Sequence, residues 1–343
     1  MELWKRILSR SIQIPSELPE PLIPEKDIKT VTDRYPIKIN PYILSLIKRK
    51  NDPIYRQFIP ELKEIEDYKG FEDPLKEEEM SPAPCIIKRY PDRVVFLVSS
   101  QCASYCRFCN RKRMVGRSKI RYNDIIDSIS YIRSDRSIRD VLLSGGDPLI
   151  LSDRDLFNIL TRLREIPHVE IIRIGTRIPC SLPQRITQEL VKMLKGFHPL
   201  YINIHFNHPS EITLQSSRAC NMLADAGIPL GSQSVLLRGI NDDHHTIKRL
   251  MQMLLKIRVR PYYLFQADRV KGTSHFWTPL EKGIEIIKSL IGHTSGLCIP
   301  HFVVDLPGGG GKVPLIPQFL LSKDRDGLVF KNYQGNPYHY PFP

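Results

Sequence analysis

The run Cys-Ala-Ser-Tyr-Cys-Arg-Phe-Cys at residues 102–109 decides how the rest of this chain is interpreted. It places three cysteines, Cys102, Cys106 and Cys109, close together on one short segment. Three thiolates can hold three corners of a four-iron, four-sulfur cube and leave the fourth iron without a protein ligand. An open iron can bind and reduce a small molecule, whereas a fully ligated cluster mainly carries electrons. The run therefore predicts an iron-sulfur site that performs chemistry.

Two other uses of these cysteines fit the sequence less well. A structural zinc site needs a fourth ligand, commonly from a second Cys-x-x-Cys pair, and the sequence contains no second pair of that kind. A disulfide framework is disfavoured because seven cysteines in 343 residues are sparse and odd in number. The remaining four stand alone and far apart, at Cys85, Cys180, Cys220 and Cys298.

The composition is that of an ordinary globular protein, with 41% hydrophobic and 25% charged residues. No apolar run approaches the roughly 18 residues of a membrane span, and the first ten residues lack the apolar segment of a secretory signal. We therefore expect no membrane partner and a cytoplasmic location, where thiols stay reduced. At 343 residues, the chain suits either two domains or one α/β barrel with additions.

The net charge of +13 raises the question of nucleic-acid binding. The positive residues are scattered, however, with one dense run at Arg111-Lys112-Arg113. No aromatic residues alternate with them as single-strand binding requires. A basic interior also suits anionic cofactors and a substrate carboxylate, so no nucleic-acid partner is expected.

The composition and hydrophobic pattern of the chain divide it into a cap, a core and a tail. Residues 1–85 are rich in proline, lysine and glutamate and predict a helical or irregular cap, with short helices such as 41–50. Residues 86–312 alternate apolar β-branched runs with amphipathic segments, which predicts an α/β fold, a partial (βα)6 TIM-like barrel. Residues 313–343 predict a tail packed on the barrel or on a partner subunit. The expected strands are 93–98, 140–143, 171–174, 201–205, 230–236, 258–264 and 301–304, and the expected helices are 124–132, 153–165, 184–194, 211–226, 243–256 and 278–291.

Several motifs follow the expected strands, where barrels of this kind carry their chemistry. The cysteine run follows the first strand, and Gly145-Gly146-Asp147 follows the second. Glycines there would let the backbone approach a ligand closely, and the Asp147 carboxylate could accept hydrogen bonds from a ligand. His205 ends the fourth strand and Asp268 follows the sixth.

A second motif, Asp-Leu-Pro-Gly-Gly-Gly-Gly-Lys, occupies residues 305–312. It is not a Walker phosphate loop, because Leu306 and Val313 stand where that loop needs glycine and Ser or Thr. A mobile glycine loop would let Lys312 enter and leave a site, and such a lysine can form a Schiff base with pyridoxal phosphate. The local sequence alone slightly favours the alternative of a flexible surface loop with a solvated lysine.

Residues 81–318 resemble the lysine 2,3-aminomutase family of radical S-adenosylmethionine, pyridoxal-phosphate-dependent enzymes. The cysteine spacing is the one with which radical enzymes bind S-adenosylmethionine at the open iron and cleave it to a 5'-deoxyadenosyl radical. Seven segments carry the resemblance in order: 102–113, 143–149, 173–179, 205–209, 231–242, 260–264 and 305–312.

The resemblance implies three cofactors: a [4Fe-4S] cluster, S-adenosylmethionine and pyridoxal phosphate. Cys102, Cys106 and Cys109 match the cluster ligands, and Lys312 matches the catalytic lysine that holds pyridoxal phosphate as an internal aldimine. The remaining cofactor contacts match Arg89, Tyr90 and Arg93 for pyridoxal phosphate, Gly145, Gly146 and Asp147 for the methionyl group, and His205 and Gln233 for the pocket lining.

The resemblance also implies the substrate-binding residues. Arg111 matches the arginine that pairs with the substrate carboxylate, a task suited to a guanidinium fork. Asp268 and Asp305 match two aspartates that clasp the distal ammonium of lysine. Two carboxylates in one site repel each other unless a cation lies between them, and a glutamate side chain would be repelled. The implied reaction interconverts free L-lysine and β-lysine by 2,3-migration of the α-amino group, through an external aldimine and a 5'-deoxyadenosyl radical. The implied electron donor is a flavodoxin or ferredoxin.

One departure from the family concerns oligomerisation. Larger members carry additional carboxy-terminal cysteines that bind zinc between subunits, whereas this sequence has no cysteine after Cys298. We expect a homo-oligomer without that zinc. Three alternatives stay open: supply of β-lysine for modification of elongation factor P, a 2,3-aminomutase acting on glutamate or arginine, and a radical enzyme that modifies RNA.

Overall fold

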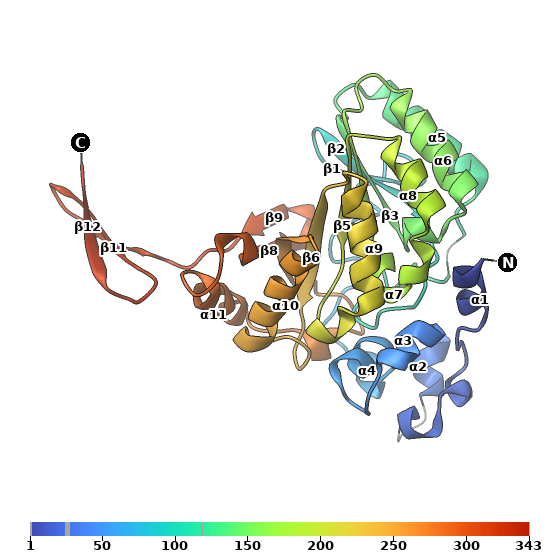
Figure 1. Ribbon diagram of the computed structural model, residues 1–343, viewed down its shortest axis with the longest axis horizontal. Helices are drawn as coiled ribbons and strands as arrows, with labels where there is room; N and C mark the ends of the chain where they lie inside the picture. Colours follow the sequence, from blue (N-terminus) through green and yellow to red (C-terminus); the bar gives the residue numbers. More distant parts are fainter. Residues whose placement is uncertain (1, 25–27, 118, 343) are drawn as a thin grey trace.

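A nine-stranded sheet forms the centre of the molecule (Figure 1). The computed structural model describes residues 2–24, 28–117 and 119–342, so the outermost residues of the predicted cap and tail, Met1 and Pro343, lie outside it. Seven neighbouring strands run parallel and curve into a partial barrel, which confirms the predicted fold class. They are β2 (Arg93–Ser99), β3 (Asp140–Gly145), β4 (Ile171–Thr176), β5 (Leu200–Ile204), β6 (Leu230–Leu236), β7 (Arg260–Gln266) and β8 (His301–Leu306).

Two antiparallel edge strands that the sequence did not predict complete the sheet. Strand β1 (Ile86–Tyr90) pairs with β2, and β9 (Gly311–Pro314) pairs with β8. Side chains join these two edges across the opening of the barrel. Arg89 Nη1 donates to Asp305 Oδ1 at 2.9 Å, and the backbone N–H of Lys312 donates to the Tyr90 hydroxyl at 2.9 Å. The barrel is therefore closed by polar side chains, and these same side chains face its interior pocket.

Six amphipathic helices cover the outside of the parallel strands, as predicted (Figure 1). They are α5 (Tyr122–Ser134), α6 (Asp153–Arg164), α8 (Gln188–Lys195), α9 (Leu214–Asp225), α10 (His244–Lys256) and α11 (Leu280–Leu290). Helix α8 begins later than expected because Pro183–Arg185 forms a 3₁₀ turn and the Thr187 side chain caps the helix by accepting from Leu190 N. A short helix that was not predicted, α7 (Ile178–Ser181), follows β4.

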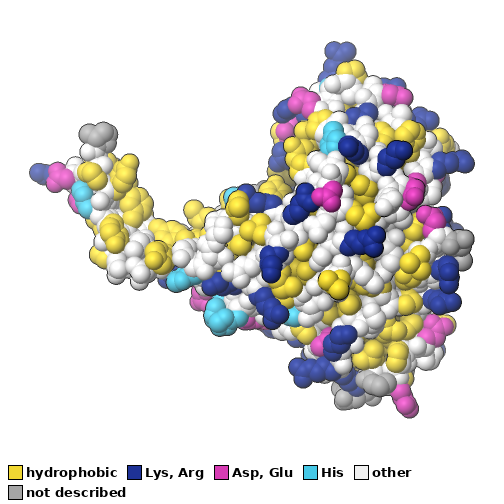
Figure 2. Space-filling view, in the orientation of Figure 1, with side chains coloured by type: hydrophobic (Ala, Val, Ile, Leu, Met, Phe, Trp, Pro, Cys, Tyr) yellow, Lys and Arg dark blue, Asp and Glu magenta, His cyan; other side chains and the backbone are white. Residues whose placement is uncertain are grey.

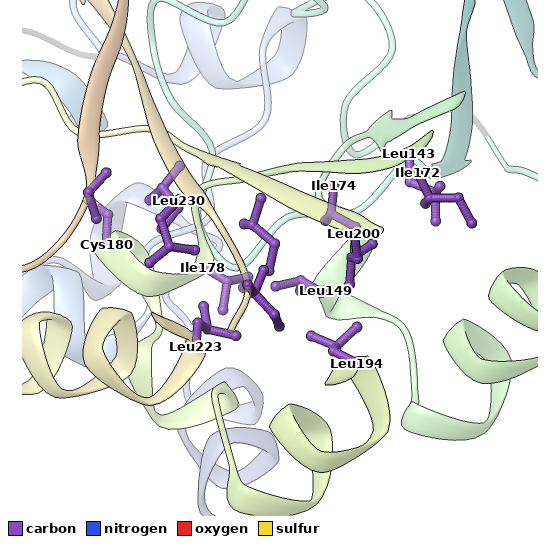
Figure 3. Packing of buried hydrophobic residues seen from close by; sticks show 14 of the residues in the cluster. Leu143, Leu149, Ile172, Ile174, Ile178, Cys180, Leu194, Leu200, Leu223 and Leu230 are labelled. Carbon is purple, nitrogen blue, oxygen red and sulfur yellow. The ribbon is translucent and has the colours of Figure 1, made fainter. Parts of the chain in front are cut away.

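The main core lies between the sheet and these helices. Figure 3 shows Ile174 and Leu200 from neighbouring strands in one apolar layer with Leu194 of α8 and Leu223 of α9. All four side chains are completely buried, and each such burial contributes about 1.5–3 kcal/mol. This layer holds the strand ends, and with them the functional loops, in fixed positions.

The amino-terminal cap consists of short helices with a small core of their own around Ile43 and Phe58. Helix α3 (Pro41–Leu46) ends earlier than the predicted 41–50, because Asp52 caps α4 (Pro53–Phe58) and also accepts from the backbone N–H of Lys48. The other cap helices are α1 (Leu3–Ser9) and α2 (Lys29–Arg34). Short 3₁₀ turns occupy Pro15–Glu17, Glu20–Leu22, Leu62–Glu64, Pro148–Ile150, Pro209–Glu211, Ser274–Phe276, Gly296–Cys298 and Pro307–Gly309.

The end of the chain forms a separate three-stranded antiparallel sheet, which we call the C-terminal arm (residues 320–342). Its strands β10 (Leu320–Lys323), β11 (Gly327–Lys331) and β12 (Pro337–Pro341) extend away from the barrel in Figure 1. The expectation that this part of the tail packs on its own barrel is therefore wrong. Tyr333 does reach the barrel side, where its ring lies 5.4 Å from that of His293. Apolar side chains lie exposed along the arm (Figure 2), among them Leu321 and Tyr340.

Surface properties agree with the composition. Figure 2 shows lysine and arginine side chains distributed over this face among apolar and acidic ones, without a continuous basic stripe. In the described part of the chain, every helix is too short or too polar to cross a bilayer.

Candidate active site

A pocket of about 980 Å³ extends through the barrel from the carboxyl ends of the strands to their starts. At one end it is lined by the cysteine loop and Asp268, and at the other by Arg93 and Arg260, the first residues of β2 and β7. Its volume is enough for more than one small ligand. Every residue predicted for the site lines this pocket: Cys102, Cys106, Cys109, Arg89, Tyr90, Arg93, Gly145, Gly146, Asp147, His205, Gln233, Arg111, Asp268, Asp305 and Lys312.

The cap holds the cysteine loop in place through its backbone. The N–H of Tyr105 donates to the Lys38 carbonyl at 2.9 Å, and the N–H of Arg107 donates to the Gln57 carbonyl at 2.8 Å. Ser104 Oγ accepts from the N–H of Asn40 at 3.1 Å. Residues of the cap and of the cysteine loop, which are far apart in sequence, thus form one hydrogen-bonded unit.

A buried ion cluster fastens the same loop. Glu64 in the cap accepts from Arg107 Nη2 and from Lys112 Nζ, each at 2.6 Å, and all three side chains are at most 5% exposed. Burial by itself would raise the pKa of Glu64, but the two cations lower it to about 2. Burial lowers the pKa of Lys112 to about 8, against the opposing attraction of Glu64. Removing one member of a buried pair typically costs about 3–5 kcal/mol, so this cluster strongly fixes the loop.

The three thiols suit the corners of a cluster. Burial raises the pKa of Cys109 to about 11, and the charge of Cys106 adds to the shift. Burial, followed by the charge of Asp147, raises the pKa of Cys102 well above its usual value. Such thiols need a bound metal to become thiolates. Among the described residues, no three His, Cys, Asp or Glu side chains form a ready site for one metal ion. A cube makes a different demand, because each thiolate binds its own iron. Three free thiols that line one pocket fit that demand.

The glycines at the end of β3, Gly145 and Gly146, pack against the start of the cysteine loop. A Cβ on Gly145, whose φ is +126°, would lie 2.1 Å from the Ser99 carbonyl oxygen, and one on Gly146 would lie 2.3 Å from that of Gln101. The N–H of Asp147 donates to the same Gln101 carbonyl at 2.8 Å. The close backbone approach that these glycines allow is therefore between the end of β3 and the start of the cysteine loop.

Asp147 connects two strand ends. Its Oδ1 accepts from Thr176 Oγ1 and its Oδ2 from the N–H of Arg177, both at 2.7 Å, and Leu149 N also donates to Oδ1. The side chain is buried, and burial raises its pKa. These contacts give Asp147 a structural role, and its contact with a ligand amine stays a prediction.

Lys312 lies in the pocket, opposite Asp305 in the β8–β9 pair. Its Nζ is 3.1 Å from Asp305 and 5.5 Å from the centre of the Phe265 ring. The glycine turn before it has positive φ at Gly308 (+71°) and Gly309 (+85°), and a Cβ on Gly309 would meet Met80. This geometry differs from the alternative of a solvated lysine on a surface loop, because the turn directs Lys312 inward.

Asp268 and Asp305 converge on the same region. Burial, followed by the charge of Asp305, raises the pKa of Asp268 to about 7, whereas Lys312 opposes the shift. In this structure Arg89 and Lys312 neutralise Asp305. The ammonium beside Asp305 in this structure is that of Lys312, and a clasp of both acids on a substrate ammonium stays a prediction.

Arg111 is oriented by a residue that sequence reasoning missed. Its Nε and Nη2 donate to the two oxygens of Glu77 at 3.1 and 2.8 Å, and its Nη1 donates to Ser144 Oγ at 3.1 Å. This side-on pairing leaves N–H groups on Nη1 and Nη2 for a ligand carboxylate. Glu77 belongs to the run Glu77-Glu78-Glu79, which by itself indicates only a charged surface.

The other end of the pocket is basic and aromatic. The guanidinium of Arg93 lies 4.0 Å from the centre of the Tyr90 ring, and Arg173 is paired with Asp140 at 2.8 Å. With Arg260, these residues provide three guanidinium groups that could hold a phosphate. Together with an amine at Lys312, this donor set fits pyridoxal phosphate.

His205 and Gln233 line the middle of the pocket. His205 Nε2 is 3.0 Å from Asn207 Oδ1, and burial lowers its pKa to about 3. The imidazole is therefore neutral at physiological pH and contributes no positive charge. A further residue that the sequence did not single out, Arg177, contacts Cys106 directly.

Comparison with known proteins agrees with these features. Residues 96–251 match the Radical SAM superfamily, and residues 287–343 match the family described as Lysine-2,3-aminomutase. The chain is 50% identical over 354 residues to the L-lysine 2,3-aminomutase of Acetoanaerobium sticklandii, covering 99% of this chain and 86% of that protein. It is 50% identical over 341 residues to the L-lysine 2,3-aminomutase of Clostridium subterminale, covering 97% and 82%. It is also 50% identical over 312 residues to the glutamate 2,3-aminomutase of Clostridioides difficile, covering 90% and 74%. Overall identity therefore does not distinguish lysine from glutamate as the substrate, and only the residues of the site can do so.

Proposed function

The chain belongs to the lysine 2,3-aminomutase family, and from this premise we propose that it interconverts L-lysine and β-lysine by moving the α-amino group between carbons 2 and 3. The observation that carries the proposal is the convergence of two acids, Asp268 and Asp305, beside Lys312 in a pocket that also contains three cysteines. Two acids favour a substrate with a distal cation.

Enzymes of this family use a [4Fe-4S] cluster, S-adenosylmethionine and pyridoxal phosphate. When bound, the cluster with S-adenosylmethionine supplies a radical that removes a hydrogen, and pyridoxal phosphate supplies a π system through which an amino group can migrate. We assign Cys102, Cys106 and Cys109 to the cluster and Lys312 to pyridoxal phosphate, with Arg89, Tyr90 and Arg93 as further contacts. Gly145, Gly146, Asp147, His205 and Gln233 complete the proposed cofactor pocket.

The chain's own groups prepare the amine and exclude water. Asp305 lies 3.1 Å from Lys312 Nζ and orients the amine in the pocket. Arg89 donates to the same carboxylate at 2.9 Å and holds it in place. The cap covers the cysteine loop, so a reactive radical would be formed away from solvent.

Substrate selection follows from charge at the two ends of the amino acid. Arg111, held side-on by Glu77, offers its remaining N–H groups to the α-carboxylate. Asp268 and Asp305 receive the ε-ammonium, and a hydrogen bond to a charged group contributes about 1.5–3 kcal/mol. Glutamate would instead bring a third carboxylate toward the two acids. This charge pattern favours lysine over glutamate, despite equal overall identity to the two kinds of relative.

The proposal is tested with anaerobically reconstituted protein given lysine, arginine or glutamate in separate reactions. Chromatography of the β-amino acids should show β-lysine as the main product. The variant Asp268→Asn should lose lysine turnover selectively, while the surface variant Asp326→Asn should behave as the parent chain. Preferential formation of β-glutamate by the parent chain would overturn the lysine assignment in favour of the glutamate alternative.

Further aspects of the proposal concern partners and organisation. We propose that a flavodoxin or ferredoxin donates the electron, that the protein works in the cytoplasm on free lysine, and that residues 1–85, 86–312 and 313–343 serve as cap, barrel and tail.

The exposed apolar arm supports a homo-oligomer in which the arm contacts a second copy. Light scattering on the full chain and on a chain ending at residue 318 would test this by giving the number of subunits in each assembly. The same number of subunits in both would contradict the proposed role of the arm.

A further inference from the structure

Arg177 is a buried arginine that contacts a predicted cluster ligand. It follows β4 and is 9% exposed. Its Nη1 donates to Cys106 Sγ at 2.6 Å. Among the described residues, Cys102 and Cys109 accept no hydrogen bond from another side chain, so the three sulfurs are not equivalent.

The guanidinium of Arg177 is fixed from several sides. Its Nη2 donates to Gln57 Oε1 at 2.6 Å and to Glu211 Oε1 at 2.7 Å. The rings of Phe58 and Phe108 lie near it, with centroids 4.8 and 5.2 Å from the guanidinium carbon. Because its charged partner and both rings are buried or part-buried, the Nη1 group has little freedom to turn away from the sulfur.

Glu211, the counter-ion of Arg177, accepts hydrogen bonds at both of its carboxylate oxygens. Glu211 is 0% exposed, and its second oxygen accepts from the N–H groups of Asn207 at 2.6 Å and His208 at 3.0 Å. The carboxylate therefore stays on the Nη2 side of Arg177, while Nη1 faces Cys106. The sulfur consequently meets the positive end of this ion pair.

We infer that Arg177 is a positioning residue for the iron-sulfur cluster, which donates a hydrogen bond to the Cys106 sulfur and makes the cluster easier to reduce. This inference rests on the proposed function, since it requires the cluster. Hydrogen bonds to cluster sulfurs and nearby charge set the reduction potential. Reduction adds one negative charge, which a neighbouring cation stabilises more strongly in a buried site than in water. The electron comes from an external one-electron donor, and no proton transfer is needed.

A competing role is capture of the carboxylate of S-adenosylmethionine by the same guanidinium. The two roles differ in a measurable way, because only the first changes the potential of the cluster when S-adenosylmethionine is absent.

The test is a redox titration of the anaerobically reconstituted full-length protein, followed by electron paramagnetic resonance without S-adenosylmethionine. Arg177→Gln should lower the midpoint potential and reduce the ratio of reduced to oxidised cluster at a fixed poise at least tenfold, which is 59 mV for one electron. Glu211→Gln should shift the potential in the opposite direction. Arg177→Gln/Glu211→Gln removes both charges, avoids a stranded buried carboxylate, and should fall below the parent chain by less than Arg177→Gln alone.

Arg185→Gln is the matched control, because Arg185 is also completely buried and ion-paired, with Asp153, but contacts no predicted ligand. It should leave the potential unchanged. If Arg177→Gln fails to retain iron, the double variant still decides the question, because it differs from Glu211→Gln only at Arg177 and should have the lower potential. Unchanged potentials in Glu211→Gln and in the double variant would overturn the inference, and weaker binding of S-adenosylmethionine in the double variant would then assign Arg177 to its carboxylate. Absence of β-lysine formation with the predicted shifts present would refute the proposed function alone.

Discussion

Replacing Glu64 by glutamine should loosen the cysteine loop and cost the protein its cluster. Glu64 is completely buried and neutralises both Arg107 and Lys112, at 2.6 Å each. The amide would leave two buried cations without a counter-charge, which costs about 3–5 kcal/mol. Unfolding entropy near 2.1 cal/mol/K per residue gives about 0.7 kcal/mol/K for a chain of this length, so the melting temperature should fall by about 4–7 °C.

The assay is anaerobic thermal unfolding with a parallel measurement of iron per chain. Glu64→Gln should show the lower melting temperature together with reduced iron content. Glu79→Gln is the matched control, because Glu79 pairs with Lys76 at the surface and is 66% exposed, and such pairs contribute about 0–1 kcal/mol. An unchanged melting temperature and full iron content in Glu64→Gln would refute the reasoning.

Three further outcomes are expected. Because burial raises the pKa of Asp268 to about 7, the affinity for lysine should rise with pH up to that value, by up to about tenfold per pH unit below it. Binding titrations on Asp268→Asn should show a flat profile, and an unchanged slope would remove Asp268 from the substrate site. Lys312→Ala should lose the visible absorbance of lysine-bound pyridoxal phosphate, and persistence of that absorbance would indicate another lysine. Gly146→Ala should lower iron per chain, because its Cβ would lie 2.3 Å from the Gln101 carbonyl oxygen. The control Gly175→Ala, with its nearest neighbour at 3.6 Å, should not; equal iron contents would contradict the packing argument.

Much of the barrel was predictable because its strands carry local signals. Buried parallel strands such as β4 (Ile171–Thr176) read as apolar β-branched runs. The edge strands lack that signal. Strand β1 is apolar only in its first half, and β9 contains glycine and proline, so both depend on pairing with distant neighbours.

The pocket-lining residues were predictable for a different reason. Cys102 and Lys312 stand in motifs whose spacing reflects the chemistry of the ligand. Glu77 and Arg177 were missed because each acts through a partner far away in the sequence, Arg111 and Cys106 respectively. An isolated charged residue in a sequence indicates a solvated surface until the fold shows what it contacts.

The cap illustrates the same limit. Its composition predicted short helices but not its function, since much of its contact with the cysteine loop is made by backbone groups such as the carbonyls of Lys38 and Gln57. Backbone contacts leave little trace in residue identity. The structure thus shows that the cap holds the cysteine loop, a role that the sequence did not indicate.

The central claim is that the protein moves the α-amino group of lysine to carbon 3 within one molecule. The most direct measurement supplies L-lysine labelled with ¹⁵N at the α-amino group to the anaerobically reconstituted protein and follows the label by nuclear magnetic resonance. The account predicts β-lysine with ¹⁵N on carbon 3 and no label in free ammonia. Label released as ammonia, or recovered only on carbon 2 while glutamate is converted instead, would contradict it.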